Sequence, residues 1–325
     1  MRAVVTGAAG FIGSHLCERL LADDHEVVGI DCFRDQYPRR LKEQNLRAAR
    51  TAPQFSFHEL DLAGDDLRPA LDGADVVFHL AGRSGLGNPC GPDFTEYVGD
   101  NIVATQRLLE ALAANPVKRL VYAGSSAVYG DAERFPTRES TVPRPLSSYG
   151  VSKLAGESLT HLYGWRLGLP VTILRYFTLY GPRQRPDMAI SRFVRALTRG
   201  DEIEIRGDGA QTRDFTFIDD AIEATIRAAK ADVGGAILNV GGGSRATINA
   251  VLEALEEITG RRSLRRYVPA PLADQRHSAA SINAARRLLS WEPKVGLRAG
   301  LAEQWSWFQS QSAPLEAKSR EAVAV

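Results

Sequence analysis

The chain has 325 residues, of which 44% are hydrophobic, so it can bury a large core in one or two domains and is not a disordered protein. Its 40 basic and 39 acidic residues leave a formal net charge of +1, which excludes the broad positive field that attracts nucleic acid or anionic membranes. Cys17, Cys32 and Cys90 fit neither a disulfide framework nor a zinc site, and no apolar run approaches the roughly 18 residues of a membrane span, so we expect a cytoplasmic protein without a metal.

Short apolar runs alternate with amphipathic segments over the first half of the chain. The strand candidates are residues 3–7, 26–31, 55–61, 75–82, 119–126 and 171–177. Several of them are apolar at consecutive positions, as strands covered by helices on both faces require. With right-handed crossovers, this alternation predicts an α/β fold with a doubly wound parallel sheet, the Rossmann arrangement.

The pattern loosens in the second half of the chain. Residues 191–209 indicate a helix and then a strand with a hairpin-like turn, and residues 217–231 indicate a further helix. Residues 236–241 (AILNVG) form another strand candidate, which could rejoin the main sheet.

We therefore expect a dinucleotide-binding domain over residues 1–178 and a second, smaller α/β lobe over 179–313. Residues near 214–243 are expected to return to the first domain. Residues 314–325 lack apolar periodicity and are expected to form a flexible tail.

The first strand and the first helix are joined by a glycine-rich turn, VVTGAAGFIGSHL, with Gly7, Gly10 and Gly13. Glycines at this place let a dinucleotide diphosphate approach the backbone N–H groups and the positive end of the helix. The alternative for the three glycines is a tight structural turn.

Acidic residues follow the second and third strands. Asp31 ends the second strand, where a carboxylate accepts hydrogen bonds from both ribose hydroxyls of adenosine and repels a 2′-phosphate, which favours NAD over NADP. A solvated turn acid is the alternative for Asp31. Asp61 and Leu62 follow the third strand at the expected adenine edge, with a plain helix cap as the alternative for Asp61.

Tyr149 and Lys153 stand four residues apart on an expected helix, so both side chains project from one face. A nearby ammonium should lower the pKa of the tyrosine toward that of a useful base. Ser125 and Ser126 lie at the end of the fifth strand, where ligands of such sheets bind. The alternative for Tyr149 and Lys153 is a tyrosine and a lysine on the surface of a helix, and the alternative for Ser125 and Ser126 is a pair of helix-capping or turn serines. For His79, we favour a hydrogen-bonded core histidine over a catalyst.

These features together resemble the extended short-chain dehydrogenase/reductases that act on nucleotide sugars. The resemblance extends over nearly the whole chain and includes HLAG at 79–82, NIVATQRLLEA at 101–111 and GDGAQTRDFTFIDDAIEA at 207–224. In the first of these motifs, Gly82 stands where the family often has alanine. The resemblance implies a bound NAD, with Phe11, Ile12, Ala81 and Asn101 among its contacts. It also implies a catalytic trio of Ser125, Tyr149 and Lys153 and a homodimer packed through helices at 101–115 and 152–166.

The resemblance also assigns residues to the nucleotide-sugar substrate. It implies that Arg213 meets the substrate diphosphate, with a salt bridge to Asp214 or Asp219 as the alternative. Arg192 could reach the diphosphate or face solvent. Arg276 lies in a stretch that resembles the nucleotide-binding C-terminal part of the family, but the stretch departs from the family pattern, so the role of Arg276 stays open.

The strand-end sequence GSSAVYG narrows the reaction. The corresponding motifs of the 4,6-dehydratases and the UDP-glucuronate decarboxylases in this group contain a glutamate where this chain has Ala127. A methyl group cannot transfer protons, so only the residues for oxidation and re-reduction at sugar C4 are left. The resemblance thus implies a 4-epimerase.

The segment RYFTLYGPRQRPDMA at 175–189 resembles the UDP-glucuronate 4-epimerases. Thr178 replaces the asparagine of the UDP-glucose enzymes, and we expect Arg185 to bind the sugar carboxylate with Thr178 and Ser126. The alternative is that Arg183 and Arg185 only solvate the turn between the lobes or pair with Asp187. A UDP-glucose or other neutral-sugar 4-epimerase, a decarboxylating relative and a non-catalytic NAD-binding regulator are the competing functions.

Overall fold

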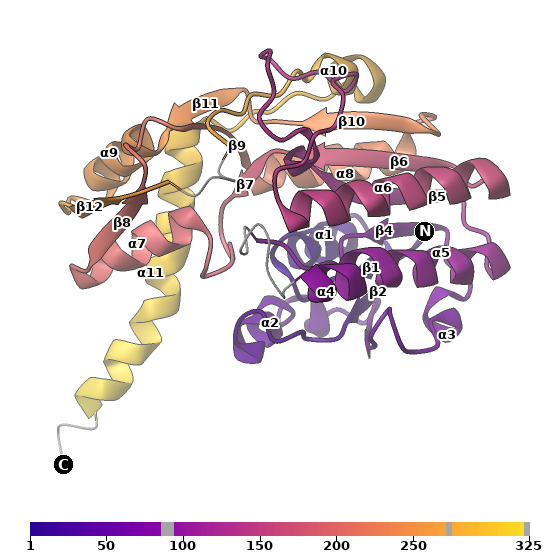
Figure 1. Cartoon of the computed structure of the whole chain (residues 1–325). Helices are drawn as coiled ribbons and strands as arrows, with labels where there is room; N and C mark the ends of the chain where they lie inside the picture. The colour runs from indigo at the N-terminus through magenta and orange to yellow at the C-terminus, as the bar shows by residue number, and fades with distance from the viewer. Residues whose placement is uncertain (86–93, 271–274, 322–325) are drawn as a thin grey trace.

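The computed structural model describes residues 1–85, 94–270 and 275–321 (Figure 1). Its centre is a sheet of seven strands that all run parallel. In spatial order the strands are β10 (Ala236–Val240), β6 (Val171–Tyr176), β5 (Arg119–Ser125), β4 (Val76–His79), β1 (Arg2–Thr6), β2 (Glu26–Asp31) and β3 (Phe55–Glu59). The predicted doubly wound parallel sheet is confirmed.

Consecutive strand residues enter different cores, because side chains alternate across a strand. Val5 packs into the core beneath α1 (Phe11–Ala22) and α8 (Ile218–Lys230), and Val4 packs into the core beneath α3 (Arg68–Leu71) and α5 (Ala104–Ala114). The long helix α6 (Ser148–Leu167) lies beside α5 on this second face (Figure 1). Burial on both faces explains why these strands are apolar at consecutive positions.

The smaller lobe contains two short sheets and most of the remaining helices. One sheet has the order β11 (Ser244–Thr247), β9 (Thr212–Phe217) and β7 (Thr178–Tyr180), and the other pairs β12 (Leu264–Val268) with β8 (Glu202–Arg206). The lobe helices are α7 (Ala189–Arg199), α9 (Ile248–Thr259), α10 (Asn283–Leu289) and α11 (Leu297–Glu321). Shorter helices α2 (Arg39–Asn45) and α4 (Phe94–Tyr97) belong to the main domain.

One expectation for the second half of the chain was wrong. β8 and β9 form no hairpin, because glycines 207 and 209, both at positive φ, redirect the chain so that β8 pairs with β12 and β9 with β7 and β11. α11 continues as a helix to Glu321, and the flexible tail expected over residues 314–325 remains a prediction. Figure 1 shows this end of α11 projecting away from the lobe.

The smaller lobe and the main domain are interwoven in the chain. β10 pairs in parallel with β6 at the edge of the main sheet, although β9 and β11, its neighbours in sequence, belong to the lobe. α8 packs against β5 and β6 in the same way. The domain boundaries at 178 and 313 remain a prediction.

Candidate active site

A cavity of about 760 Å³ lies at the carboxyl ends of β1 to β6 and extends beneath the smaller lobe. It brings together most of the residues that the sequence singled out. Its lining includes Gly7, Gly10, Phe11, Ile12, Gly13, Asp31, Asp61, Leu62, Ala81, Ser125, Ser126, Tyr149, Lys153, Thr178, Arg185, Arg192 and Arg213. Asn101 and Arg276 are not part of the lining.

The glycine turn leaves no room for a side chain at Gly7 or Gly13. Gly7 has φ +71, and a Cβ built on it would lie 2.8 Å from the backbone nitrogen of Ala81. A Cβ on Gly13 would lie 2.1 Å from the Gly7 carbonyl oxygen. α1 begins here without a side-chain cap, so its first N–H groups are available to an anion. These features fit the diphosphate of a dinucleotide.

The carboxylate of Asp31 is held in place beside this turn. Its two oxygens accept hydrogen bonds from the backbone nitrogens of Ala9 (3.1 Å) and Phe33 (2.8 Å). Burial raises the pKa of this carboxyl group, and the Lys42 ammonium opposes the rise. A fixed carboxylate at the end of β2 suits the adenosine ribose of NAD.

Asp61 also lines the cavity, but its carboxylate has partners of its own. It accepts hydrogen bonds from Arg34 (2.8 Å) and from the backbone nitrogen of Ala63 (3.0 Å). These partners show that the Asp61 carboxylate stabilises the turn after β3. A contact of Asp61 or Leu62 with adenine remains a prediction.

The start of α6 fixes the Tyr149 and Lys153 side chains. Ser147 caps the helix by accepting a hydrogen bond from the Gly150 nitrogen (3.1 Å), and Gly150 packs so closely on Ala127 that a Cβ would lie 2.7 Å from its carbonyl oxygen. Lys153 lies one helical turn beyond Tyr149, and its Nζ is 4.6 Å from the centre of the Tyr122 ring.

The protonation of this pair differs from the expectation. Burial raises the pKa of Tyr149, although hydrogen bonding with Ser125 and the charge of Arg185 act in the opposite direction. Burial also lowers the pKa of Lys153 to about 8, against the influence of Glu157. The prediction that the Lys153 ammonium lowers the pKa of Tyr149 was therefore wrong for the protein without ligands, because desolvation raises that pKa.

Ser125 has two partners at the end of β5. Its hydroxyl is hydrogen-bonded with Tyr149 and also accepts from the backbone nitrogen of Ala127 (3.1 Å). Ser125 can therefore both stabilise the turn after β5 and act on Tyr149 in the cavity.

Asn101 supports the site from behind instead of lining it. Its buried side chain accepts from the Arg83 nitrogen (2.7 Å) and donates to the Arg83 oxygen (2.9 Å) and to Ser152 Oγ (2.8 Å), next to Lys153. These hydrogen bonds brace the loop after β4, and a direct contact of Asn101 with the cofactor remains a prediction. A Cβ on Gly82 would lie 2.7 Å from Asn101 Oδ1, which explains the absence of alanine there.

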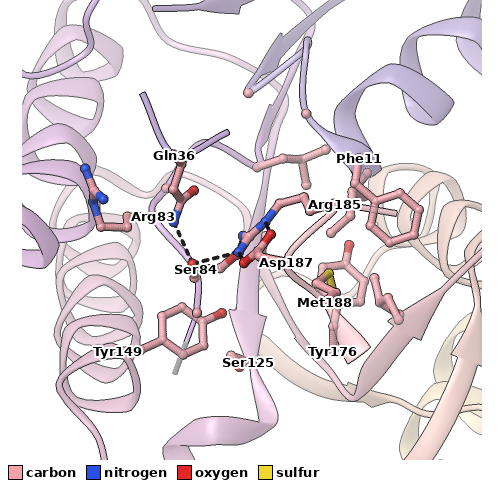
Figure 2. A pocket seen from close by; sticks show the side chains of 18 of the residues that line it. Phe11, Gln36, Arg83, Ser84, Ser125, Tyr149, Tyr176, Arg185, Asp187 and Met188 are labelled. Carbon is pink, nitrogen blue, oxygen red and sulfur yellow. Dashed lines mark hydrogen bonds and ion pairs between the residues drawn. The ribbon is translucent and has the colours of Figure 1, made fainter. Parts of the chain in front are cut away.

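Arg185 reaches the cavity from the turn after β7, where its side chain is only 10% exposed. Its guanidinium pairs with Asp187 and donates to Ser84, as the dashed lines in Figure 2 show. Thr178 and Ser126 line the same cavity. Arg183, in contrast, turns away at φ 62 and pairs with Glu18 of α1.

The other candidate arginines separate into two groups. Arg192 and Arg213 line the cavity, and Arg213 donates to the backbone oxygen of Thr212 (3.0 Å). Arg276 is drawn to the surface by a two-point ion pair with Asp208 (2.9 and 2.8 Å), so the structure does not place it among the cavity-lining residues. Asp208 follows β8 in a glycine turn, and no sequence motif marks it as the partner of Arg276.

Several lining residues were missed by the sequence analysis: Gln36, Tyr37, Lys42 and Ser84. They follow the carboxyl ends of β2 and β4, the edge where ligands bind, but no motif marks them. His79, in agreement with the core interpretation, bonds to Thr6 (2.8 Å) and Thr105 (2.9 Å), and burial lowers its pKa to about 3.

Other kinds of site are not apparent in residues 1–85, 94–270 and 275–321. None of the helices there is long and apolar enough to cross a membrane, and no three His, Cys, Asp or Glu side chains gather in a way that could hold a metal ion. Cys17 and Cys32 are free thiols, and Cys90 lies outside the described residues.

The fold and the Ser-Tyr-Lys arrangement over a glycine turn define an extended short-chain dehydrogenase/reductase whose cofactor is NAD. The model of the NAD dependent epimerase/dehydratase family matches residues 3–241, and the chain belongs to this family.

Relatives with the same architecture are nucleotide-sugar epimerases. The "Uncharacterized UDP-glucose epimerase YtcB" of Bacillus subtilis is 41% identical over 95% of this chain and 98% of the relative. A UDP-glucuronate 4-epimerase of Thermodesulfobacterium geofontis is 37% identical over 94% of this chain and 95% of the relative. The crystal structure of a Bacillus cereus UDP-glucuronic acid 4-epimerase with UDP-glucuronic acid and NAD is 40% identical, with a TM-score of 0.93 over 96% of this chain and 100% of that one.

Proposed function

We propose that the protein is a UDP-glucuronate 4-epimerase, which interconverts UDP-glucuronic acid and UDP-galacturonic acid through a 4-keto sugar. The observation that carries this proposal is Arg185, a buried guanidinium that lines the same cavity as Tyr149 and Ser125. A cation at this place can bind the carboxylate of an acidic sugar at two points. The Bacillus cereus enzyme, solved with UDP-glucuronic acid and NAD, supports the same substrate.

The residues around sugar C4 manage its proton. Tyr149 takes the hydroxyl proton as C4 is oxidised and returns it at the end, while Ser125 holds the phenol group by its hydrogen bond. The Lys153 ammonium would hold the nicotinamide ribose by hydrogen bonds. Bound NAD supplies the hydride acceptor and a positive ring charge.

The residues around sugar C6 hold the carboxylate. Arg185 binds it at two points, and the hydroxyls of Thr178 and Ser126 complete its hydrogen bonds. Oxidation at C4 creates a β-keto acid, which loses carbon dioxide when the bond to the carboxylate aligns with the carbonyl π system. A clamp that keeps this bond out of alignment in both ring orientations permits epimerisation without decarboxylation.

Product analysis tests this proposal. The protein is incubated with UDP-glucuronate, and the nucleotide sugars are separated by chromatography. We expect UDP-galacturonate and no UDP-pentose. Without a galacturonate product the proposal fails, and faster conversion of UDP-glucose would favour the neutral-sugar 4-epimerase to which the name of the Bacillus subtilis relative points.

The replacement Tyr149→Phe tests the alternative of a non-catalytic regulator. We expect turnover to fall by about 10²- to 10⁴-fold, the usual contribution of a positioned acid–base group, with NAD still bound. Biological activity that survives this replacement would favour the regulator.

We also propose a cytoplasmic homodimer. Val103, Val151, Leu162 and Trp165 are exposed apolar side chains on α6 and on the helical turn before α5, and Trp165 is 77% exposed. Two copies that pack these helices together would cover them. Light scattering should give twice the chain mass for the protein and the chain mass for the pair of replacements Leu162→Glu and Trp165→Glu.

A further inference from the structure

The guanidinium of Arg185 uses nearly all of its hydrogen-bonding capacity inside the protein. Nε and Nη2 donate to the two carboxylate oxygens of Asp187 at 3.0 and 2.5 Å. Nη2 also donates to the Ser84 carbonyl oxygen (3.0 Å), and Nη1 donates to the Ser84 hydroxyl. Of the five N–H groups of an arginine, these contacts leave one on Nη1.

The two partners of Arg185 differ in how firmly they are held. The Ser84 carbonyl oxygen also accepts from Gln36 Nε2 (2.6 Å), so it belongs to a network that joins the loops after β2 and β4 (Figure 2). Asp187 is two residues from Arg185 in the same turn, and its side chain is 51% exposed against 10% for Arg185. The carboxylate can therefore swing into solvent at little cost, while the guanidinium cannot.

The pair with Asp187 is local and links no separate elements of the fold. Although partial burial opposes ionisation, Arg185 lowers the pKa of Asp187, so the aspartate is a carboxylate at neutral pH. It occupies the Nε and Nη2 edge of the guanidinium, the geometry that a sugar carboxylate would use.

We propose that Asp187 is a specificity-determining residue, an internal carboxylate that occupies the side edge of Arg185 and is exchanged for the carboxylate of an acidic sugar. This inference rests on the proposed function, because it takes its ligand to be a nucleotide sugar with a carboxylate. The exchange keeps the number of charge-assisted hydrogen bonds on Arg185 constant, so binding of the acid costs no unpaired cation. It also limits the affinity for the acid, which lets the sugar leave the clamp after epimerisation.

Binding measurements in the Tyr149→Phe background test this exchange, because that variant should not convert the ligand. Calorimetry of the NAD-loaded protein with UDP-glucuronate and with UDP-glucose is compared for Asp187 and for Asp187→Asn. We expect the replacement to tighten UDP-glucuronate binding by about two- to fivefold, the range for a partly exposed ion pair, and to leave UDP-glucose unchanged. Asp66→Asn, which removes an equal charge outside the cavity, should change neither.

Each other outcome decides against the exchange. Weaker binding of UDP-glucuronate by Asp187→Asn would mean that Asp187 positions Arg185, and equal changes for both sugars would mean a general field effect. The readout is a ratio of affinities and not turnover. A protein that makes no UDP-galacturonate would therefore refute the proposed function without refuting the exchange, whereas UDP-glucuronate that binds neither variant would refute both.

Discussion

At the scale of single residues, the protonation of Lys153 should control cofactor binding. Burial lowers its pKa to about 8, so the side chain is charged below that pH and neutral above it. If the ammonium holds the nicotinamide ribose, the affinity for NAD should fall as the pH rises through 8. Titrations of nucleotide-free protein between pH 6.5 and 9.5 would measure this, and Lys153→Met should bind NAD more weakly and without the pH dependence. An unchanged pH dependence in that variant would assign the effect to another group.

The sequence predicted residues whose partners lie within one turn or at a strand end. Tyr149 and Lys153 follow from helical spacing, and Gly7 and Asp31 from their place after strands. Asn101 and Arg276 lie outside the cavity lining because their partners, Arg83 and Asp208, are set by tertiary contacts that no local pattern encodes. The raised pKa of Tyr149 was missed for the same reason, since desolvation depends on the complete cavity.

At the scale of elements, the turn between β1 and α1 should tolerate no side chain at Gly13. A methyl group there would lie 2.1 Å from the Gly7 carbonyl oxygen, so Gly13→Ala must displace the turn and the N–H groups that face the cavity. We expect NAD binding to weaken by more than about tenfold, equivalent to roughly 1.4 kcal/mol. Gly64→Ala is the matched control, because a Cβ at Gly64 meets nothing within 4 Å. Equal affinities of the two variants would show that the turn adapts.

The contact between α6 and β6 includes a buried ion pair. Arg175 Nε donates to Glu157 Oε2 at 2.9 Å, and both side chains are at most 6% exposed. Glu157→Gln would leave a buried guanidinium without its counter-charge, so the free energy of unfolding should fall by about 3–5 kcal/mol. Urea unfolding measures this loss.

The double replacement Glu157→Gln with Arg175→Met should recover most of that stability, because no unpaired charge remains. At the exposed pair of Glu202 and Arg266, Glu202→Gln should reduce the free energy of unfolding far less, because water and salt screen the pair. Similar losses at the two sites would contradict the role given to burial.

At the scale of the whole molecule, histidines whose pKa is lowered by folding should make the fold sensitive to acid. The pKa of His15 is lowered to about 4 and that of His79 to about 3, mainly by burial. Between pH 6.5 and these values the unfolded chain binds protons that the native state does not, so stability falls as the pH falls, by about 1.4 kcal/mol per pH unit for each such histidine.

Urea unfolding at a series of pH values tests this acid sensitivity. His15→Gln should reduce the slope of the unfolding free energy between pH 6.5 and 4, and His79→Asn should reduce it further if the variant folds. Replacement of the exposed His161 by Gln serves as the control. A slope that His15→Gln leaves unaltered would mean that carboxylates alone govern the acid response.

The return of β10 to the edge of the main sheet limits how this protein can be engineered. A fragment that stops at residue 178 would lack both its outermost strand and α8, and it would expose the unpaired edge of β6. The substrate lobe is therefore not a cassette that a single splice can exchange between relatives. A working chimera needs further junctions that leave 218–240 with the parent sheet.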